Sequence, residues 1–441
     1  MSRKKTKILQ APRGTYDILP EDQIYWEKVR RVVRELADDY GFARIDTPII
    51  EDTELFIKGT GQTTDIVQKQ MYSFRTLGND SLTLRPEGTP GVIRSYIQSG
   101  MINAPHPVKL YYFGPMFRYE HPQAGRYRQF YQFGFETIGG QEPVLDVQLI
   151  QLFSHILNDL GLKKINVQVN SLGCPECRPG FRRGLVDYYR SRKNRICPDC
   201  QKRIKINPLR LLDCKEEKCQ PIKTDAPLPL DYLCHGCHNH FKSVLEFLDE
   251  LDIPYFLNHQ LVRGLDYYTK TVFEVWPESD SVQSPEKEEA QEIKEPISLG
   301  GGGRYDNLVK MLGGKVTPSA GFAAGIERII YLMKEQGVKL PSKSNAKVFL
   351  VQLGELGQRK SMKLFEELHK AEIKVAESLS KPSIKSQLRI ADKLGVKFSL
   401  ILGQQEALDS SVIIRDMQSG VQETVPKEKV VNELKKRLAK K

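Results

Sequence analysis

The eight cysteines of this chain of 441 residues all lie within residues 174–237. They form four close pairs, namely Cys174 and Cys177, Cys197 and Cys200, Cys214 and Cys219, and Cys234 and Cys237. A short spacing on a tight turn brings both thiolates of a pair to one tetrahedral ion, so four pairs are enough for two sites of four thiolates. We therefore expect two structural Zn²⁺ ions. Which pairs combine stays open, and His235, His238 and His240 are substitute ligands.

The sequence predicts neither export nor insertion into a membrane. The basic residues 1–5 are followed at residues 11–14 by Ala-Pro-Arg-Gly, where a signal peptide would have an apolar core. The longest apolar runs, residues 348–351 and 400–402, are only as long as strands. We expect a cytoplasmic protein without membrane contact, in which thiols stay reduced and free to bind metal.

The order of helical and extended patterns predicts several domains of α/β type. Aromatic-rich strands at 108–117 and 129–138 flank a polar loop, which indicates an antiparallel hairpin. The further elements that we expect are helices at 21–41, 143–160, 239–251 and 326–336, strands at 164–170 and 319–325, and strand over most of 255–276. After a linker at 341–345, strands alternate with helices, as in a compact α/β domain.

Net charge is +11 and is unevenly distributed. Residues 341–441 contain 20 Lys and Arg against 12 Asp and Glu, and residues 174–238 contain 14 against 8. Two basic modules favour a polyanionic partner, with a solvated lysine-rich surface as the alternative. Residues 279–296 hold six acids, two lysines and no aromatic residue, which predicts a disordered surface loop.

The hairpin carries the strongest indication of a ligand. Arg118, Arg126 and Arg128 surround its loop, and guanidinium groups bind phosphate oxygens in a bidentate manner. On the return strand, Gln132 and Glu136 share a face because side chains alternate with a period of two. Taken alone, Glu136 indicates a structural ion pair. The four glycines 300–303 match no phosphate-binding loop or dinucleotide fingerprint, so they predict a close approach of backbones.

Two further segments complete an ordered set. Residues 263–268 read Arg-Gly-Leu-Asp-Tyr-Tyr, and residues 325–328 read Gly-Ile-Glu-Arg at the start of a helix. Together with Pro48, with 117–120 (Phe-Arg-Tyr-Glu), with 83–89 and with 301–306, this order resembles the class II aminoacyl-tRNA synthetases, specifically the histidyl-tRNA synthetase family. The resemblance covers nearly the whole chain. The paired cysteines and the long acidic stretch 279–296 depart from the usual pattern of the family.

The resemblance implies a fold, domains and an activity. The fold would be an α+β catalytic domain with an antiparallel sheet flanked by helices (residues 1–170 and 255–338), an inserted Cys-rich domain (171–254) and a C-terminal α/β anticodon-binding domain (345–441). The activity would be ATP-dependent activation of L-histidine and its transfer to tRNA(His), with Mg²⁺ bridging the phosphates. The class also implies a homodimer.

It also implies roles for individual residues. Glu87, Thr89 and Gln132 would hold the α-ammonium group, and Glu136 and Tyr268, with Tyr267 beside them, would contact the imidazole. Arg118 would bind the α-phosphate, Arg126 would assist in binding ATP, and Arg328 would bind the γ-phosphate. Arg263 would stabilise charge that develops on the α-phosphorus, with a salt bridge to Asp266 as the structural alternative.

Two other classes of function stay open at this stage. One is a catalytically inactive paralogue that acts as a regulatory subunit of ATP phosphoribosyltransferase. That paralogue lacks the C-terminal domain, whereas this chain keeps it and retains Arg118, Arg263 and Arg328. The other is a zinc-ribbon nucleic-acid-binding protein with a degenerate enzyme core. Histidine-dependent ATP–pyrophosphate exchange separates the synthetase from both.

Overall fold

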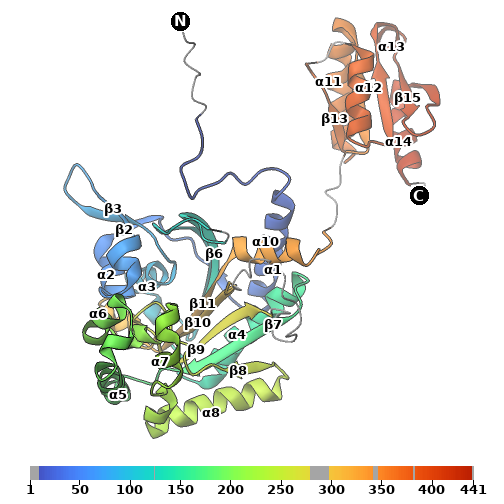
Figure 1. Ribbon diagram of the computed structural model, residues 1–441. Coiled ribbons are helices and arrows are strands. Elements are labelled where there is room, and N and C mark those ends of the chain that lie inside the picture. Colours follow the sequence, from blue (N-terminus) through green and yellow to red (C-terminus); the bar gives the residue numbers. More distant parts are fainter. Residues whose placement is uncertain (1–8, 124, 279–296, 341–345, 381–382, 440–441) are drawn as a thin grey trace, which may run out of the picture. The chain divides into compact units, whose positions relative to one another are not determined.

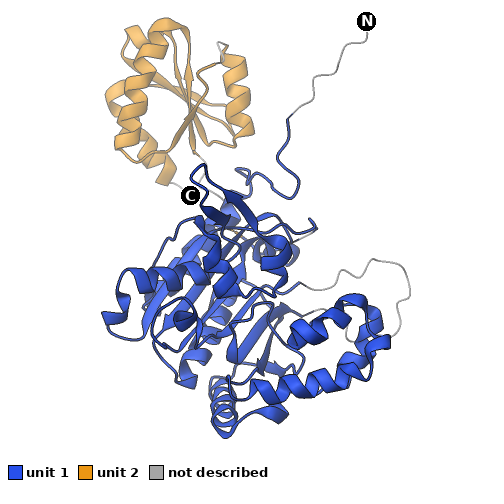
Figure 2. Ribbon diagram, turned by 90° about the vertical axis from the view of Figure 1, so that its left-hand side faces the viewer, with its two compact units in different colours: residues 1–339 blue, residues 340–441 orange. Residues whose placement is uncertain are grey.

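The computed structural model describes residues 9–123, 125–278, 297–340, 346–380 and 383–439. The chain divides into two compact units, Met1–Lys339 and Leu340–Lys441, which Figure 2 shows in blue and orange. The predicted acidic loop 279–296 and the predicted linker 341–345 lie outside the described residues.

An eight-stranded sheet forms the centre of the first unit, in the order β1-β5-β6-β11-β10-β9-β7-β8. The six central strands pair antiparallel, and only the edge strands β1 and β8 pair parallel with their neighbours. The hairpin is present with the predicted bounds. The strands are β1 (Ala43–Arg44), β5 (Val108–Phe117), β6 (Gln129–Ile138), β7 (Ile165–Ser171), β8 (Tyr255–Leu257), β9 (Thr269–Pro277), β10 (Gly300–Arg304) and β11 (Ser319–Gly325).

The glycines of β10 permit the close approach that their sequence predicts. This strand lies between β9 and β11. A Cβ atom on Gly302 would lie 2.0 Å from the carbonyl oxygen of Gly321, and one on Gly301 would lie 2.4 Å from that of Phe273. Only residues without a side chain fit here, so this part of the sheet presents bare backbone.

Helices flank the sheet and bury its aromatic residues. The helix α4 packs against β11, α1 and α8, and the ring of Phe153 on α4 stacks on Phe322 of β11 at 4.8 Å. This arrangement confirms the predicted antiparallel sheet flanked by helices. The helices of this part are α1 (Gln23–Asp39), α2 (Thr53–Thr60), α3 (Thr89–Gln98), α4 (Pro143–Asp159), α9 (Leu308–Met311) and α10 (Ile326–Glu335). A small sheet in the order β2-β4-β3 consists of β2 (Ile50–Asp52), β3 (Tyr72–Arg75) and β4 (Ser81–Leu84).

The cysteine-rich segment is helical, whereas the sequence pattern predicts only the last of its helices. Its helices are α5 (Arg178–Arg190), α6 (Pro198–Ile206), α7 (Gln220–Thr224) and α8 (His235–Glu250). The first three begin with a proline in the first turn, where the missing N–H group costs nothing. Figure 1 shows α5, α6 and α7 together on one side of the large sheet.

The prediction of strand over most of 255–276 is wrong for residues 258–268. These residues form a loop between β8 and β9, which we call the 258–268 loop. The aromatic and apolar residues that favour strand here are instead buried side chains of the loop, including Leu261, Val262, Tyr267 and Tyr268. The loop carries the Arg-Gly-Leu-Asp-Tyr-Tyr segment.

The second unit is the predicted compact α/β domain. Its sheet has the order β13-β12-β14-β15-β16. Two elements were not predicted, the short helix α13 and the exposed edge strand β16. The strands are β12 (Val348–Gln352), β13 (Val375–Glu377), β14 (Phe398–Leu402), β15 (Ser411–Asp416) and β16 (Gln422–Pro426), and the helices are α11 (Gly354–Lys370), α12 (Ile384–Lys393), α13 (Gln404–Leu408) and α14 (Val430–Ala439). None of the helices in the described part of the chain is both long and apolar enough to span a bilayer.

Candidate active site

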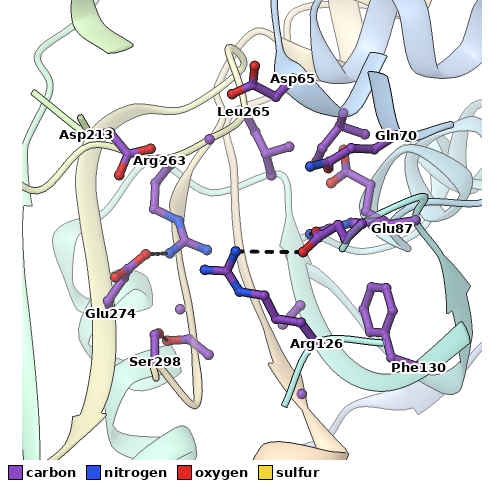
Figure 3. Close-up of a pocket in the computed structure, with 18 of the residues that line it drawn as sticks. Asp65, Gln70, Glu87, Arg126, Phe130, Asp213, Arg263, Leu265, Glu274 and Ser298 are labelled. Carbon is purple, nitrogen blue, oxygen red and sulfur yellow. Dashed lines mark hydrogen bonds and ion pairs between the residues drawn. The ribbon is translucent and has the colours of Figure 1, made fainter. Parts of the chain in front are cut away.

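A cavity of about 840 Å³ lies in the first unit, on one face of the large sheet. Its walls come from the β5–β6 hairpin, from β10 and β11, from the 258–268 loop and from the cysteine-rich segment. Figure 3 shows Arg263 and Arg126 pointing toward each other inside it, with Glu274 beside Arg263. Every residue for which the sequence predicts a role with histidine or ATP, except Glu136, lines this cavity.

Two buried carboxyl groups belong to this region, Glu87, which lines the cavity, and Glu136, which does not. Glu87 accepts hydrogen bonds from Thr60 Oγ1 (2.5 Å) and from the Tyr267 hydroxyl (2.8 Å). Glu136 accepts from Thr89 Oγ1 (2.6 Å) and from the Tyr305 hydroxyl. Burial raises the pKa of both groups, that of Glu136 to about 8, because the charged form loses its hydration.

The buried amide oxygen Oε1 of Gln132 has no hydrogen-bond partner among the residues that the structure describes. Gln132, Glu87 and Thr89 all line the cavity. Buried acceptors are costly without a donor, so this group is suited to a ligand that carries several N–H groups.

Four arginines line the same cavity, Arg118, Arg126, Arg263 and Arg328. The Nε of Arg118 donates to the carbonyl of Pro86 (2.9 Å), and its guanidinium lies 5.3 Å from the centre of the Phe130 ring. The guanidinium of Arg328 donates to the carbonyls of Gly125 (3.0 Å) and Ser298 (2.7 Å). Burial, together with the nearby positive charges of Arg126 and Arg118, lowers the pKa of Arg328 to about 10. Such a cluster favours a polyanion.

Arg263 does not form the salt bridge to Asp266 that was the structural alternative. Its guanidinium pairs with Glu274 of β9, not with Asp266, and lies 5.6 Å from the centre of the Tyr268 ring. Asp266 instead accepts hydrogen bonds from Thr63 Oγ1 (2.7 Å) and from Asn207 Nδ2 (2.8 Å). Arg128, the third arginine of the hairpin, lies over the ring of Tyr119 at 4.1 Å.

Three residues that contact the candidate site were not predicted from the sequence. Tyr305 donates to Glu136, Glu274 pairs with Arg263, and Asp65 accepts from Arg210 at 2.6 Å. Tyr305 lies two residues after the four glycines, within the 301–306 segment, so its place in a motif was a usable signal. The partners of Glu274 and Asp65 lie 11 and 145 residues away in the sequence, and no local pattern reveals them.

The eight cysteines gather into two clusters. Cys174, Cys177, Cys234 and Cys237 form the first cluster, and Cys197, Cys200, Cys214 and Cys219 form the second. In each cluster the four sulfur atoms lie within 4.8 Å of one another. The outer pairs therefore combine with each other, and so do the inner pairs. The ring nitrogen Nε2 of His240 donates to Asp146 Oδ2 (2.9 Å), so this histidine has another partner.

The geometry of the clusters fits a tetrahedral ion. Sulfur–sulfur distances of 3.6 Å (Cys174 to Cys177) and 3.9 Å (Cys197 to Cys214) match the edge of about 3.8 Å that a Zn–S bond of about 2.3 Å requires. Backbone N–H groups also point at sulfur atoms, as from Cys197 to Cys219 Sγ (3.2 Å) and from Cys234 to Cys177 Sγ (3.1 Å). Such donors stabilise thiolates.

Comparison with known proteins decides the family. A family model described as histidyl-tRNA synthetase matches residues 14–176 and 222–329. The histidine--tRNA ligase of Dehalococcoides mccartyi (strain ATCC BAA-2266) is 45% identical over 431 residues, which cover 98% of this chain and 100% of the relative. The chain belongs to the histidyl-tRNA synthetase family.

Other comparisons extend this assignment to the whole chain. A model described as an anticodon binding domain matches residues 347–437. The histidine--tRNA ligase of Desulforamulus reducens is 43% identical over 426 residues, or 97% of this chain and 99% of the relative. The crystal structure of apo S. aureus histidyl-tRNA synthetase superposes with a TM-score of 0.77 at 36% identity, covering 97% of this chain and 100% of that one. These full-length matches favour the synthetase over the regulatory paralogue.

The match to the histidyl-tRNA synthetase family model is interrupted in one place within the first unit. Residues 177–221 fall between its two matched segments. That interval contains five of the eight cysteines, including the whole second cluster. The second cluster is therefore a feature of this chain outside the part that the family model describes.

Proposed function

We propose that the protein activates L-histidine with ATP to histidyl-adenylate and transfers the histidyl group to tRNA(His). Membership of the histidyl-tRNA synthetase family over nearly the full length supports this activity. The observation that carries it is one cavity lined both by the buried carboxyl group of Glu87, suited to an amino acid, and by four arginines, suited to a triphosphate.

Histidine would bind at the base of the cavity. Glu87, Thr89 and the partnerless oxygen of Gln132 would accept hydrogen bonds from the α-ammonium group. Tyr267 would fix Glu87 through its hydroxyl. Glu136 and Tyr268 would contact the imidazole nitrogens. An apolar side chain of similar shape would leave both of these polar groups without hydrogen-bond partners. Such substrates are disfavoured by up to about 10⁴-fold, which would give the site its specificity for histidine.

ATP would bind along the arginines. Arg118 would contact the α-phosphate, Arg328 the γ-phosphate, and Arg126 the phosphates between them. The carboxylate of histidine attacks the α-phosphorus, the bond to the β-phosphate oxygen breaks, and pyrophosphate leaves. Arg263 would stabilise the negative charge that develops in this step, with no protein nucleophile.

Mg²⁺ would neutralise the phosphates of ATP when bound with the nucleotide. Oxygen ligands suit this ion, and Glu120 and Glu274 are carboxylates that line the cavity close to its arginines. Both are near arginines, since Arg126 lies 3.9 Å from Glu120 and Arg263 pairs with Glu274. They are the residues that would hold the ion.

The two cysteine clusters would each hold one structural Zn²⁺ as four thiolates. A shell of four protein ligands leaves no position for a substrate. Elemental analysis of the protein, purified without chelators under reducing conditions, should give two zinc ions per chain. A zinc content near zero would refute this assignment.

The remaining parts of the proposal concern partners and domains. Residues 341–441 carry an excess of eight positive charges, which would favour tRNA through its phosphates. We also propose the homodimer of the class, a cytoplasmic location, and the domain boundaries predicted above, with residues 171–254 as the inserted domain.

Pyrophosphate exchange into ATP tests the proposed function. Each of the twenty amino acids is offered separately, and only histidine should support exchange. Aminoacylation of tRNA(His) transcript should follow the same specificity. Exchange that is absent, or equal for several amino acids, would reject the proposal.

A further inference from the structure

The second cysteine cluster forms part of the wall of the active-site cavity. Cys197 and Cys214 both line it, as do Asp199, Asp213 and Glu216 beside them. All four sulfur-bearing residues of the cluster are buried, at 1–8% exposed. A metal site at this position would be a neighbour of the substrates and not a remote structural feature.

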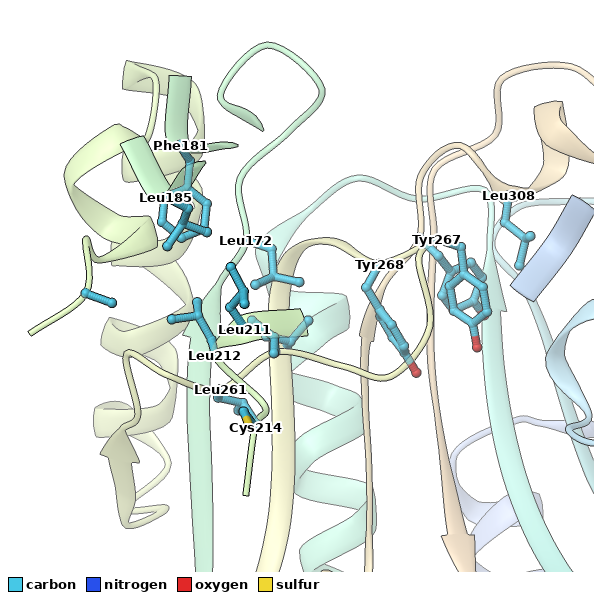
Figure 4. Packing of buried hydrophobic residues seen from close by; sticks show 14 of the residues in the cluster. Leu172, Phe181, Leu185, Leu211, Leu212, Cys214, Leu261, Tyr267, Tyr268 and Leu308 are labelled. Carbon is cyan, nitrogen blue, oxygen red and sulfur yellow. The ribbon is translucent and has the colours of Figure 1, made fainter. Parts of the chain in front are cut away.

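The cluster also shares one hydrophobic core with the residues proposed to bind histidine. This core contains Cys197, Cys200, Cys214 and Cys219 together with Tyr267, Tyr268 and Tyr305. Figure 4 shows it running from Phe181 and Leu185 of α5 through Leu211, Leu212 and Leu261 to Tyr267 and Tyr268. Because packed cores transmit displacements, a change in the cluster would reach both tyrosines.

Polar contacts connect the same two places. The segment 207–213 joins the two halves of the cluster, since it follows α6, which carries Cys200, and ends directly before Cys214. Asn207 Nδ2 donates to Asp266 Oδ1 (2.8 Å) in the 258–268 loop and to Thr63 Oγ1 (3.1 Å). Thr63 Oγ1 in turn donates to Asp266 Oδ2 (2.7 Å). Both carboxylate oxygens of Asp266 are therefore held.

Arg210 forms the second connection. Its side chain is 11% exposed and donates to Asp65 Oδ2 (2.6 Å) and to Asp213 Oδ2 (2.9 Å), the residue before Cys214. Arg203 of α6 adds a contact with Asp65 at 3.4 Å. A Cβ atom on Gly264 would lie 3.2 Å from Arg210 Nη1, so the loop and this arginine are in close contact.

From there the contacts lead to the proposed ammonium site. The backbone N–H of Asp266 donates to the carbonyl of Thr60 (3.1 Å), and Thr60 Oγ1 donates to Glu87. Tyr267, the next residue of the loop, donates to the same carboxylate. The loop that carries Arg263 is thus fixed between Glu87 and the segment 207–213.

We propose that a Zn²⁺ ion in the second cluster is a positioning element of the active site. By fixing segment 207–213, the ion holds the 258–268 loop so that Arg263 and Tyr267 face the substrates. This inference rests on the proposed function for its kinetic consequence. Cys214 and Cys219, which complete the shell of the ion, lie 17 and 22 positions after Cys197. Only short helical turns lie between Asn207 and Cys219. A crosslinking ion supplies cohesion that so small a segment lacks.

The test compares two variants that act at successive points of this connection. Cys200→Ser should reduce zinc from two ions to one per chain. Arg210→Ala should keep two ions and break the contact with Asp65. Both should lower kcat of histidine-dependent exchange, on the order of 10²-fold for a displaced catalytic group, and raise KM for histidine. KM for ATP should stay unchanged, because Arg118 and Arg328 lie outside the connection.

Non-additivity is the decisive feature. If the ion acts through Arg210 and its segment, the double variant should lose no more activity than the worse single variant. Lys202→Ala is the matched control, because Lys202 lies on the same helix with its side chain 74% exposed. It should keep two ions and full exchange. Full exchange in a folded Cys200→Ser variant that has lost one ion would overturn the inference.

A second measurement does not depend on catalysis. Amide hydrogen exchange of the 258–268 loop should accelerate in Cys200→Ser, while strands β12 and β14 of the second unit stay protected. Unchanged protection of the loop after loss of the ion would overturn the inference. Absence of histidine-dependent exchange in the unmodified protein would reject the proposed function instead, and the amide measurement would still decide the role of the ion.

Discussion

Arg263 is the residue on which the proposed chemistry depends most. Its guanidinium is paired with Glu274 and lies beside the Tyr268 ring, so its position is fixed before substrates bind. A cation held in place costs no reorganisation when negative charge develops on the α-phosphorus. The same pairing has a structural consequence, because removing the cation leaves a half-buried carboxylate without its partner.

We therefore expect Arg263→Ala to abolish adenylate formation and to spare histidine binding. The barrier should rise by about 3 kcal/mol or more, which is a loss of more than 10²-fold in the exchange rate. The double variant Arg263→Ala with Glu274→Gln removes the unpaired carboxylate and controls for misfolding. Exchange at the rate of the unmodified protein in either folded variant would contradict the assigned role.

Glu136 gives the site a dependence on pH. Its pKa is raised to about 8 by burial, so the carboxyl group is mainly protonated at pH 7. An imidazole N–H that donates to this group favours the carboxylate, which lowers its pKa. Binding of histidine at pH 7 should therefore release most of one proton, whereas binding at pH 9 should release far less from this group.

Calorimetric titration at pH 7 in two buffers of different ionisation enthalpy measures this proton. The matched control is Glu136→Gln, which keeps the size of the side chain and cannot titrate. Net proton uptake by the unmodified protein, or equal release from both proteins, would rule out Glu136 as the partner of the imidazole.

At the scale of elements, the sequence predicted structure best where one local pattern determines it. The bounds of β5 and β6 were predicted because two aromatic strands flank one polar loop. The 258–268 loop was missed because its shape depends on Asn207, Arg210 and Thr60, which are distant in sequence. The pairing of the cysteines could not be read from spacing, since each cluster combines pairs separated by a helix or more. Most residues of the proposed histidine and ATP sites, by contrast, were found through motifs.

The strand β10 offers a test at this scale. Gly302→Ala would place a methyl group 2.0 Å from a backbone oxygen that cannot move aside. We expect a loss of about 1–3 kcal/mol in the free energy of unfolding, or more, and a lower Tm. Gly180→Ala on α5 is the matched control, because its Cβ would meet its nearest neighbour, Tyr232 Cδ1, at an ordinary 3.5 Å. Equal Tm values for the two variants would contradict this account of the glycine strand.

At the scale of the molecule, the two compact units separate the two steps of the proposed reaction. The candidate active site lies wholly within Met1–Lys339, whereas the match to an anticodon binding domain lies within Leu340–Lys441. Deleting residues 341–441 should keep most histidine-dependent exchange and strongly reduce transfer to tRNA. Both activities are measured on one preparation, with circular dichroism to verify folding. Parallel loss of both in a folded truncation would argue against this division.

The arginines of the cavity bear on how the protein withstands heat. Burial lowers the pKa of Arg328, and the nearby positive charges of Arg126 and Arg118 lower it further, so these cations repel one another in the folded protein. A nucleotide that binds only the folded state removes this repulsion and adds about 2.7 kcal/mol at a concentration of 100 Kd. Melting temperature should therefore rise steeply with ATP. Salt should reproduce only a small part of the rise, because it screens buried charges much less than exposed ones. The protein should therefore resist thermal unfolding best when ATP is bound. A fall in the ATP concentration would lower its melting temperature.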